Sequence, residues 1–268
     1  MNIIYHRSNQ QNPLREGRPL GHITVNGERL TRFNLDQLAD REYYDAQVED
    51  PYTSGKMLNG YLFSPNSLVM AHETSFAQVK QRSVGAFSLI GKQVSLAEGI
   101  QIGESTEVQS FVSIGEDATI GNRTVLRKSA RIGHRTHLGI IVQVGQETTV
   151  GAQCNIDNGS VLARNVQLGN MVQIGTQSRV ERHSRLHNSV DVKESVFIGE
   201  HVRVYDGVLI GELGKVGAYT VIGKGAIVGA EAEIGEMGTL RPSAWIRAGE
   251  IVPSPTDEFR RSRYYHRY

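Results

Sequence analysis

Two pairs of basic side chains recur at an interval of eighteen residues in the second half of the chain. His183 and His201 form one pair, Arg185 and Arg203 form the other, and Tyr219 follows His201 at the same interval. If eighteen residues make one coil, the members of each pair stack about 4.8 Å apart. Stacked guanidinium groups repel each other unless an anion or a carboxylate offsets them. The spacing therefore predicts a patch that binds an anion or a protein partner; the alternative is a solvated basic face.

Two other histidines lie close together in the sequence and could take part in proton transfer. His134 and His137 lie in the segment Ile132-Gly133-His134-Arg135-Thr136-His137-Leu138. A neutral imidazole takes a proton from a hydroxyl or an amine, and histidine is the residue most often used for this step. The alternative is that both are exposed polar residues. The histidines of the chain form no three-ligand cluster with the spacing of a zinc site, so no metal is predicted.

A six-residue repeat governs the stretch that carries these residues. Every sixth residue from Val84 to Val252 is Val, Ile or Leu, at 29 positions without a slip. From Ser88 onward the residue two places earlier is small or β-branched, with Glu250 as the exception, and Gly follows more than half of the aliphatic positions. Two inward side chains separated by one outward side chain make a very short strand. Gly suits a turn that needs positive φ or a close backbone approach. A strand and a turn every six residues predict an all-β solenoid.

The repeat resembles the hexapeptide-repeat superfamily, in which an aliphatic residue is followed by Gly or another small or acidic residue, two variable residues, a small one and a variable one. The resemblance covers 84–252. It implies a left-handed parallel β-helix with three strands per coil, here about ten triangular coils. It also implies a parallel homotrimer, and acyl transfer with acyl-CoA or an acyl carrier protein bound between subunits. The carbonic anhydrases of this superfamily need a histidine trio across neighbouring coils, and this sequence does not supply one.

Two functions remain open at this point. The first is a non-catalytic scaffold or binding protein, without a cofactor, that presents flat β-helix faces to a protein or an anionic partner. The unbroken repeat favours it, because many transferases of the superfamily interrupt the helix with a loop that builds the acceptor site. The alternative is an acyltransferase that depends on CoA or a carrier protein, with its site at a subunit interface and His134 or His137 as the base.

Several large apolar residues fall on outward positions of the repeat. Contiguous apolar surface on a soluble protein indicates an interaction site, so these residues predict the interface of the homotrimer. On one face they are Phe87, Leu89, Val125, Ile141, Val161, Phe197 and Leu213, and on another Leu209, Ile227 and Trp245. Cys154, the single cysteine, falls on a small inward position and is expected to be a buried filler rather than a nucleophile.

The flanking residues depart from the repeat. Residues 1–56 are expected to form an N-terminal cap with an arm, a hairpin around Asn26-Gly27 and a short helix over 35–44. Residues 57–83 are expected to form irregular first coils, and 253–268 a capping tail. A formal charge of +1 gives no strong signal for nucleic acid. The sequence shows no signal peptide or membrane span, which predicts a cytoplasmic protein and leaves signal-independent secretion open.

Overall fold

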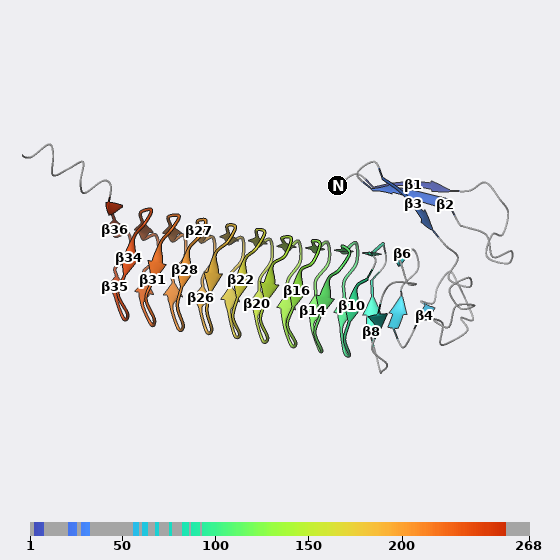
Figure 1. Ribbon diagram of the computed structural model, residues 1–268, viewed down its shortest axis with the longest axis horizontal. Helices are drawn as coiled ribbons and strands as arrows, with labels where there is room; N and C mark the ends of the chain where they lie inside the picture. Colours follow the sequence, from blue (N-terminus) through green and yellow to red (C-terminus); the bar gives the residue numbers. More distant parts are fainter. Residues whose placement is uncertain are drawn as a thin grey trace, which may run out of the picture.

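The computed structural model of the protein is a three-sided parallel β-solenoid (Figure 1). It describes the strands between residues 3 and 84 and the chain from 85 to 255 except residues 86 and 92, with side chains from Val84 onward. Each coil contributes one strand to each of three sheets, which we call the arginine, tryptophan and phenylalanine faces. From Val84 onward their strands pair in parallel with partners eighteen residues away, as the repeat predicted, whereas Lys56–Leu58 and Tyr61–Phe63 pair antiparallel.

The arginine face is the ten-stranded sheet. Its strands are β7 (Ser75–Phe76), β10 (Ser95–Leu96), β13 (Ser113–Ile114), β16 (Arg131–Ile132), β19 (Thr149–Val150), β22 (Gln167–Leu168), β25 (Arg185–Leu186), β28 (Arg203–Val204), β31 (Val221–Ile222) and β34 (Thr239–Leu240).

The tryptophan face is the twelve-stranded sheet. Its strands are β4 (Lys56–Leu58), β5 (Tyr61–Phe63), β8 (Arg82–Val84), β11 (Gln101–Ile102), β14 (Thr119–Ile120), β17 (His137–Leu138), β20 (Asn155–Ile156), β23 (Gln173–Ile174), β26 (Asp191–Val192), β29 (Leu209–Ile210), β32 (Ile227–Val228) and β35 (Trp245–Ile246).

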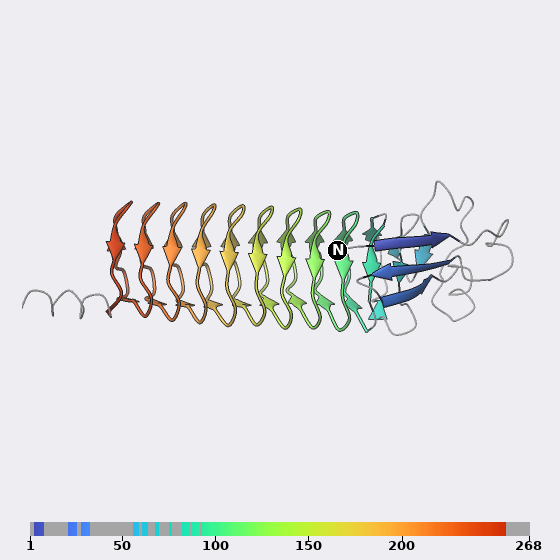
Figure 2. The same ribbon diagram turned by 90° about the horizontal axis from the view of Figure 1, so that it is seen from above.

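The phenylalanine face is the eleven-stranded sheet. Its strands are β6 (Leu68–Val69), β9 (Leu89–Ile90), β12 (Glu107–Val108), β15 (Val125–Leu126), β18 (Gln143–Val144), β21 (Val161–Leu162), β24 (Arg179–Val180), β27 (Phe197–Ile198), β30 (Lys215–Val216), β33 (Glu233–Ile234) and β36 (Ile251–Val252). From β9 to β36 each strand begins six residues after the previous one, so the coils form a single uninterrupted stack (Figure 2).

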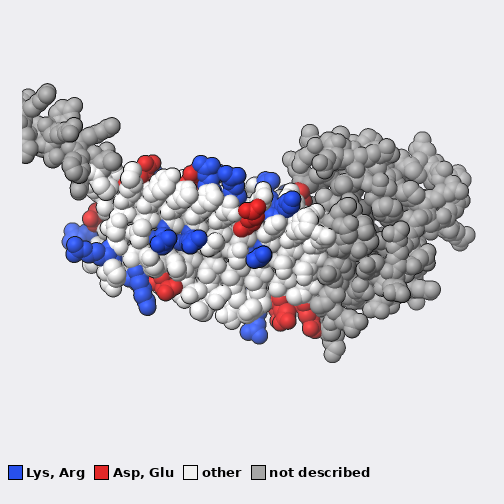
Figure 3. Space-filling model, in the orientation of Figure 1, with Lys and Arg blue, Asp and Glu red and all other residues white. Residues whose placement is uncertain are grey.

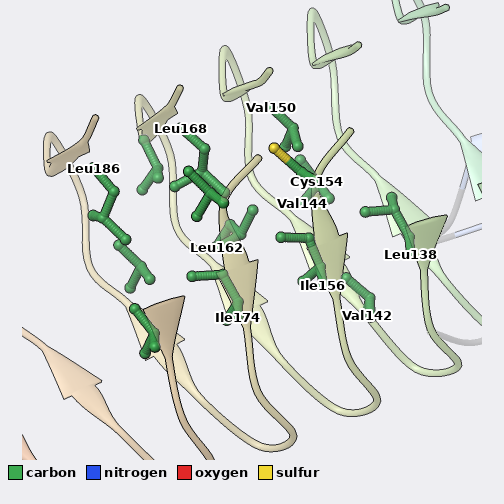
Figure 4. Close-up of a cluster of buried hydrophobic side chains, with 14 of the residues drawn as sticks. Leu138, Val142, Val144, Val150, Cys154, Ile156, Leu162, Leu168, Ile174 and Leu186 are labelled. Carbon is green, nitrogen blue, oxygen red and sulfur yellow. The ribbon is translucent and has the colours of Figure 1, made fainter. Parts of the chain in front are cut away.

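The core fills the interior of the prism. The second residue of each strand points inward, and from Val84 to Ile246 all of these aliphatic side chains are buried. Figure 4 shows Leu138, Ile156 and Leu162 converging between neighbouring coils. Burying a Val, Leu or Ile side chain contributes about 1.5–3 kcal/mol, and consecutive coils share these contacts. Each coil is therefore stabilised mainly by its contacts with the coil before it and the coil after it.

Hydroxyl groups at the small inward positions bond one coil to the next. The Thr124 hydroxyl donates to the carbonyl of Gly139 over 2.9 Å and accepts the N–H of Val142 over 3.3 Å. The Ser160 hydroxyl donates in the same way to the carbonyl of Gly175 over 2.8 Å. Buried hydroxyls are tolerated when they are hydrogen-bonded, which explains why Ser and Thr alternate with Val and Ala at these positions.

The structure separates two roles that the sequence analysis assigned together to the glycines. Left-handed φ occurs at the third residue after the aliphatic position, here called the corner position, in every hexad from Phe87 to Gly249, and most corner residues are not glycine. The Gly that directly follows the aliphatic residue serves close approach instead. A Cβ on Gly151 would lie 2.2 Å from the carbonyl oxygen of Gly169 in the next coil.

The residues before the regular coils also contain strands. The strands β1 (Ile3–Arg7), β2 (Gly21–Val25) and β3 (Glu28–Arg32) form an antiparallel sheet, and Val25 pairs with Glu28 on either side of the expected turn. Phe63 pairs with Val84, 21 positions later, so the eighteen-residue spacing does not hold for this pair of strands. The predicted helix over 35–44 and the tail over 256–268 lie outside the described residues. The described residues include no helix with the length and hydropathy of a membrane span.

Candidate functional site

The two arginines of the predicted patch lie on adjacent strands of the arginine face. Arg185 in β25 is the register partner of Arg203 in β28, and Gln167 in β22 is the partner of Arg185 on the other side. All three side chains occupy the outward position of their strand and are exposed. Parallel neighbours lie about 4.8 Å apart, so one amide and two guanidinium groups form a column along the solenoid axis.

The two histidines form a second column at the corner beside the arginines. The rings of His183 and His201 are stacked with centroids 4.9 Å apart, and the ring of Tyr219 continues the stack 4.9 Å beyond His201. Asn165 occupies the same corner one coil before His183. Because ring faces cover one another along this stack, the ring edges carry the polar groups that a ligand can reach.

The two columns line one open groove of about 540 Å³. Its lining residues come from three consecutive coils and are Asn165, Gln167, His183, Arg185, His201, Val202 and Arg203. The structure thus brings four residues of the predicted patch together, and Tyr219 joins through its stack on His201. Asn165 and Gln167 were not singled out in the sequence, because uncharged amides on a repeat surface carry no signal of their own.

The guanidinium groups of Arg185 and Arg203 have no carboxylate partner within the described part of the chain. The corners that border these two strands, over 181–188 and 199–206, contain three carboxylates, and each has another partner. Glu181 pairs with Arg179, Glu200 pairs with Arg182 over 2.7 Å, and Asp206 accepts the N–H of Asn188 over 2.9 Å. The hydrogen bond and the charge of Glu200 raise the pKa of Arg182. Arg185 and Arg203 therefore have no salt-bridge partner at these corners, although Asp206, which accepts only a backbone N–H there, still adds one negative charge nearby.

The surrounding surface carries both signs of charge. Lysine and arginine occur in small groups separated by aspartate, glutamate and uncharged residues on the side shown in Figure 3. This distribution matches the formal charge of +1 and differs from the continuous basic stripe of a nucleic-acid-binding protein.

A second aromatic pair borders the other edge of the arginine face. The rings of His187 and Tyr205 are stacked with centroids 5.0 Å apart, at positions where the coils before and after have Gly169 and Gly223. Two successive coils therefore present His-x-Arg-x-His and His-x-Arg-x-Tyr in register. The two coils in which His187 and Tyr205 replace this glycine are thus also the coils that carry the stacked rings of His183 and His201.

The two candidate bases His134 and His137 lie apart from this groove. His134 is exposed on the turn after β16, and His137 is exposed on the tryptophan face, where its register partners are Thr119 and Asn155. Neither lines the groove. Their catalytic role remains a prediction. Across the described residues, no three His, Cys, Asp or Glu side chains are grouped as a metal site requires.

The apolar residues predicted to form an interface lie along one side of the solenoid. On the phenylalanine face the apolar side chains occur in every second coil and alternate with Glu107, Gln143 and Arg179. Apolar strand positions are Leu89, Val125, Val161 and Phe197, and apolar corner positions are Phe87, Ile141 and Leu213. On the tryptophan face Leu209, Ile227 and Trp245 are consecutive register partners, and Trp245 is 73% exposed. A homotrimer through the phenylalanine face remains a prediction.

Cys154 is buried, and we expect its thiol to react slowly in the folded protein. Its side chain is 2% exposed, and Sγ lies 3.1 Å from the carbonyl oxygen of Gly169. Burial raises the pKa of this thiol, so less of the reactive thiolate is present. Labelling with a chromogenic disulfide at pH 8 should be about 100-fold slower or more in buffer than in denaturant. Complete labelling of the folded protein at the rate of the denatured protein would contradict this.

Comparison with known proteins gives structural similarities only. No family model matches the chain, and no curated protein matches it. Among solved structures, it is similar to a UDP-N-acetylglucosamine acyltransferase from Campylobacter jejuni, with 12% identity, a TM-score of 0.49, and coverage of 65% of this chain and 67% of that one. The corresponding enzyme of Bacteroides fragilis has 16% identity, a TM-score of 0.42, and coverage of 63% and 65%.

A perosamine N-acetyltransferase mutant from Caulobacter crescentus, solved with CoA and GDP-perosamine, has 14% identity, a TM-score of 0.30, and coverage of 63% of this chain and 76% of that one. These similarities concern the fold, and the chain spans about two thirds of the length of the two UDP-N-acetylglucosamine acyltransferases. The six-residue repeat and its three parallel sheets are those of a hexapeptide-repeat β-solenoid.

Proposed function

We propose that the chain is an acyltransferase of the hexapeptide-repeat type that binds an anionic part of its substrate in the groove of the arginine face. The observation that carries the proposal is the placement of two guanidinium groups, neither of them in a salt bridge within the described residues, beside two imidazoles in three consecutive coils. Guanidinium groups bind phosphate and carboxylate groups, and imidazole transfers protons near neutral pH. The resemblance of the repeat supplies the class of reaction.

The chemistry needs one base and one leaving thiolate. A neutral imidazole accepts the proton of the acceptor hydroxyl or amine, whose oxygen or nitrogen attacks the thioester carbonyl of the acyl donor. A new C–O or C–N bond forms, the C–S bond breaks, and the imidazolium returns its proton to the departing thiolate. We assign the base to His201, because His183 and Tyr219 cover its two ring faces and hold the ring plane.

The arginine pair provides the first test. The double variant Arg185→Glu with Arg203→Glu should retain the stability of the wild type, since both side chains are exposed. Its affinity for acetyl-CoA in a calorimetric titration should fall by about 100-fold or more, because two attractive charges become repulsive. Arg131→Ala, which removes an arginine from the same column three coils away, is the matched control. Equal acetyl-CoA binding by the double variant and the wild type would place the donor site elsewhere.

A non-catalytic scaffold is the second candidate, and one observation favours it. The strands from β9 to β36 follow one another every six residues, so the described coils contain no inserted loop that would build an acceptor pocket over the groove. The groove is open to solvent and would present its charged columns to a protein partner. Failure of acetyl-CoA and of an acylated carrier protein to bind the folded oligomer would favour this second candidate.

A further inference from the structure

We infer that the groove recognises a phosphate monoester, bound as a dianion across β25 and β28 between Arg185 and Arg203. The inference deepens the proposed function, because it specifies which chemical group of a substrate the arginine pair holds.

Charge and spacing favour a group that bridges the two strands. The guanidinium groups carry two positive charges on adjacent strands, and the three carboxylates at the flanking corners are engaged elsewhere. A phosphate monoester carries about −1.5 to −2 charges at pH 7 and has three terminal oxygens. It can accept bonds from both guanidinium groups at once. A carboxylate has one charge and is satisfied by a single bidentate arginine, so it leaves the second arginine unbalanced.

The ring stack also favours a polar group over an aromatic one. Both faces of the His201 ring are covered, by His183 and by Tyr219. A purine or pyrimidine base therefore finds no free face on that ring, whereas the edge offers imidazole nitrogens to the oxygens of a phosphate. Asn165 and Gln167 continue both columns with neutral amides. Charge is thus concentrated on two of the three coils, over a length that fits one phosphate.

A phosphate monoester can come from either side of an acyl transfer. On the donor side, CoA carries one on its 3′-hydroxyl, whereas the pantetheine arm of a carrier protein is attached through a phosphodiester. On the acceptor side, a sugar phosphate carries one. Two matched pairs of ligands separate these sources. They are CoA with dephospho-CoA, and glucose 6-phosphate with glucose.

The experiment is a calorimetric titration of the full chain with each of the four ligands. We expect one of the two pairs to show about 10- to 100-fold tighter binding of the phosphorylated member. The preference should disappear in Arg185→Ala with Arg203→Ala and persist in Arg131→Ala. It should be weakened in Arg203→Lys, which keeps the charge and loses the bidentate fork. A circular dichroism melt of each variant shows that the fold is retained.

The outcomes of this titration are independent of turnover. Equal binding within both pairs, or a preference that survives in the double variant, would overturn the inference even if acyl transfer were observed. A preference that depends on both arginines, in a protein that transfers no acyl group, would support the inference and count against the proposed function. A preference for glucose 6-phosphate identifies the acceptor as the source of the monoester. A preference for CoA identifies the donor, and because the 3′-phosphate and the thioester lie at opposite ends of CoA, it would also move the base away from His201.

Discussion

Replacing Gly151 by alanine should lower the free energy of unfolding by about 3 kcal/mol, whereas Gly207→Ala should cost no more than about 1 kcal/mol. The two glycines serve the turns in different ways. A Cβ on Gly151 would meet the backbone of Gly169 at 2.2 Å, which is far inside van der Waals contact. Gly207 has φ of +67° and no atom within 4 Å of its would-be Cβ. Its conformation is also adopted by 23 residues that are not glycine.

The neighbouring coil cannot move away from Gly151 without losing hydrogen bonds. The N–H of Ala152 donates to Oδ1 of Asn170 over 2.9 Å, and the N–H of Asn170 donates to Oδ1 of Asn188 over 2.8 Å. Gly151 itself donates to the carbonyl of Leu168 over 3.0 Å. Residues with a Cβ do occupy this corner in other coils, at Ala97, His187 and Tyr205, but at Gly151 the backbone of Gly169 fills the space that the Cβ needs. The expected loss of unfolding free energy in Gly151→Ala thus comes from pushing apart two coils that are joined by hydrogen bonds.

Urea unfolding followed by far-ultraviolet circular dichroism measures both variants. The Gly151→Ala transition should move to lower urea, and its slope should change if the solenoid begins to unfold from that point, since repeat proteins unfold by nearest-neighbour coupling. The unfolding free energy of Gly207→Ala should stay within about 1 kcal/mol of the wild-type value. A larger loss of stability in Gly207→Ala than in Gly151→Ala would mean that positive φ, and not close approach, is the costly feature.

Most of the solenoid could be predicted from the sequence because its core follows one rule. An aliphatic residue every six positions determines which side chains point inward, and three strands per coil then determine every register pair, including Arg185 with Arg203. The sequence could not show that the glycine after each aliphatic residue serves the close approach of two coils, while positive φ falls at the corner position, two residues after that glycine. Residues such as Phe87, Ile141 and Leu213 adopt left-handed φ although their types do not favour it, because the neighbouring coils fix the backbone of each corner.

The candidate site could be predicted only in part. The eighteen-residue interval placed His183 under His201 and Arg185 under Arg203, because position along a regular solenoid is arithmetic. The same interval places Arg182 beside Glu200 and Asn188 beside Asp206, but it could not show that these residues bond to each other rather than to the arginine pair, since that depends on side-chain rotamers. Those contacts decide that the arginine pair is left without a carboxylate. His134 and His137, the candidate bases proposed from the sequence, lie outside the groove, and their role stays a prediction.

Replacing His201 by glutamine should reduce kcat for acyl transfer by about 100-fold or more, with little change in the affinity for acetyl-CoA. Glutamine retains a polar side chain but has no nitrogen that accepts a proton at neutral pH, and a positioned general base contributes about 10²–10⁴ in rate. The substitution leaves Arg185 and Arg203, to which we assign the anionic part of the substrate, in place.

The separation of kcat from affinity is what distinguishes a base from a binding residue. Thiol release from acetyl-CoA, measured with a panel of amine and hydroxyl acceptors, gives kcat, and calorimetry gives the Kd of the donor. Arg131→Ala again controls for the loss of a polar side chain on the same face.

An equal loss of kcat and affinity in His201→Gln would make this residue part of the binding surface. A loss of turnover confined to His134→Ala or His137→Ala would move the chemistry out of the groove. The described coils contain no inserted loop that could cover the groove. A base in this groove must therefore act on an acceptor that is bound at an open surface, or at a site that a second subunit completes.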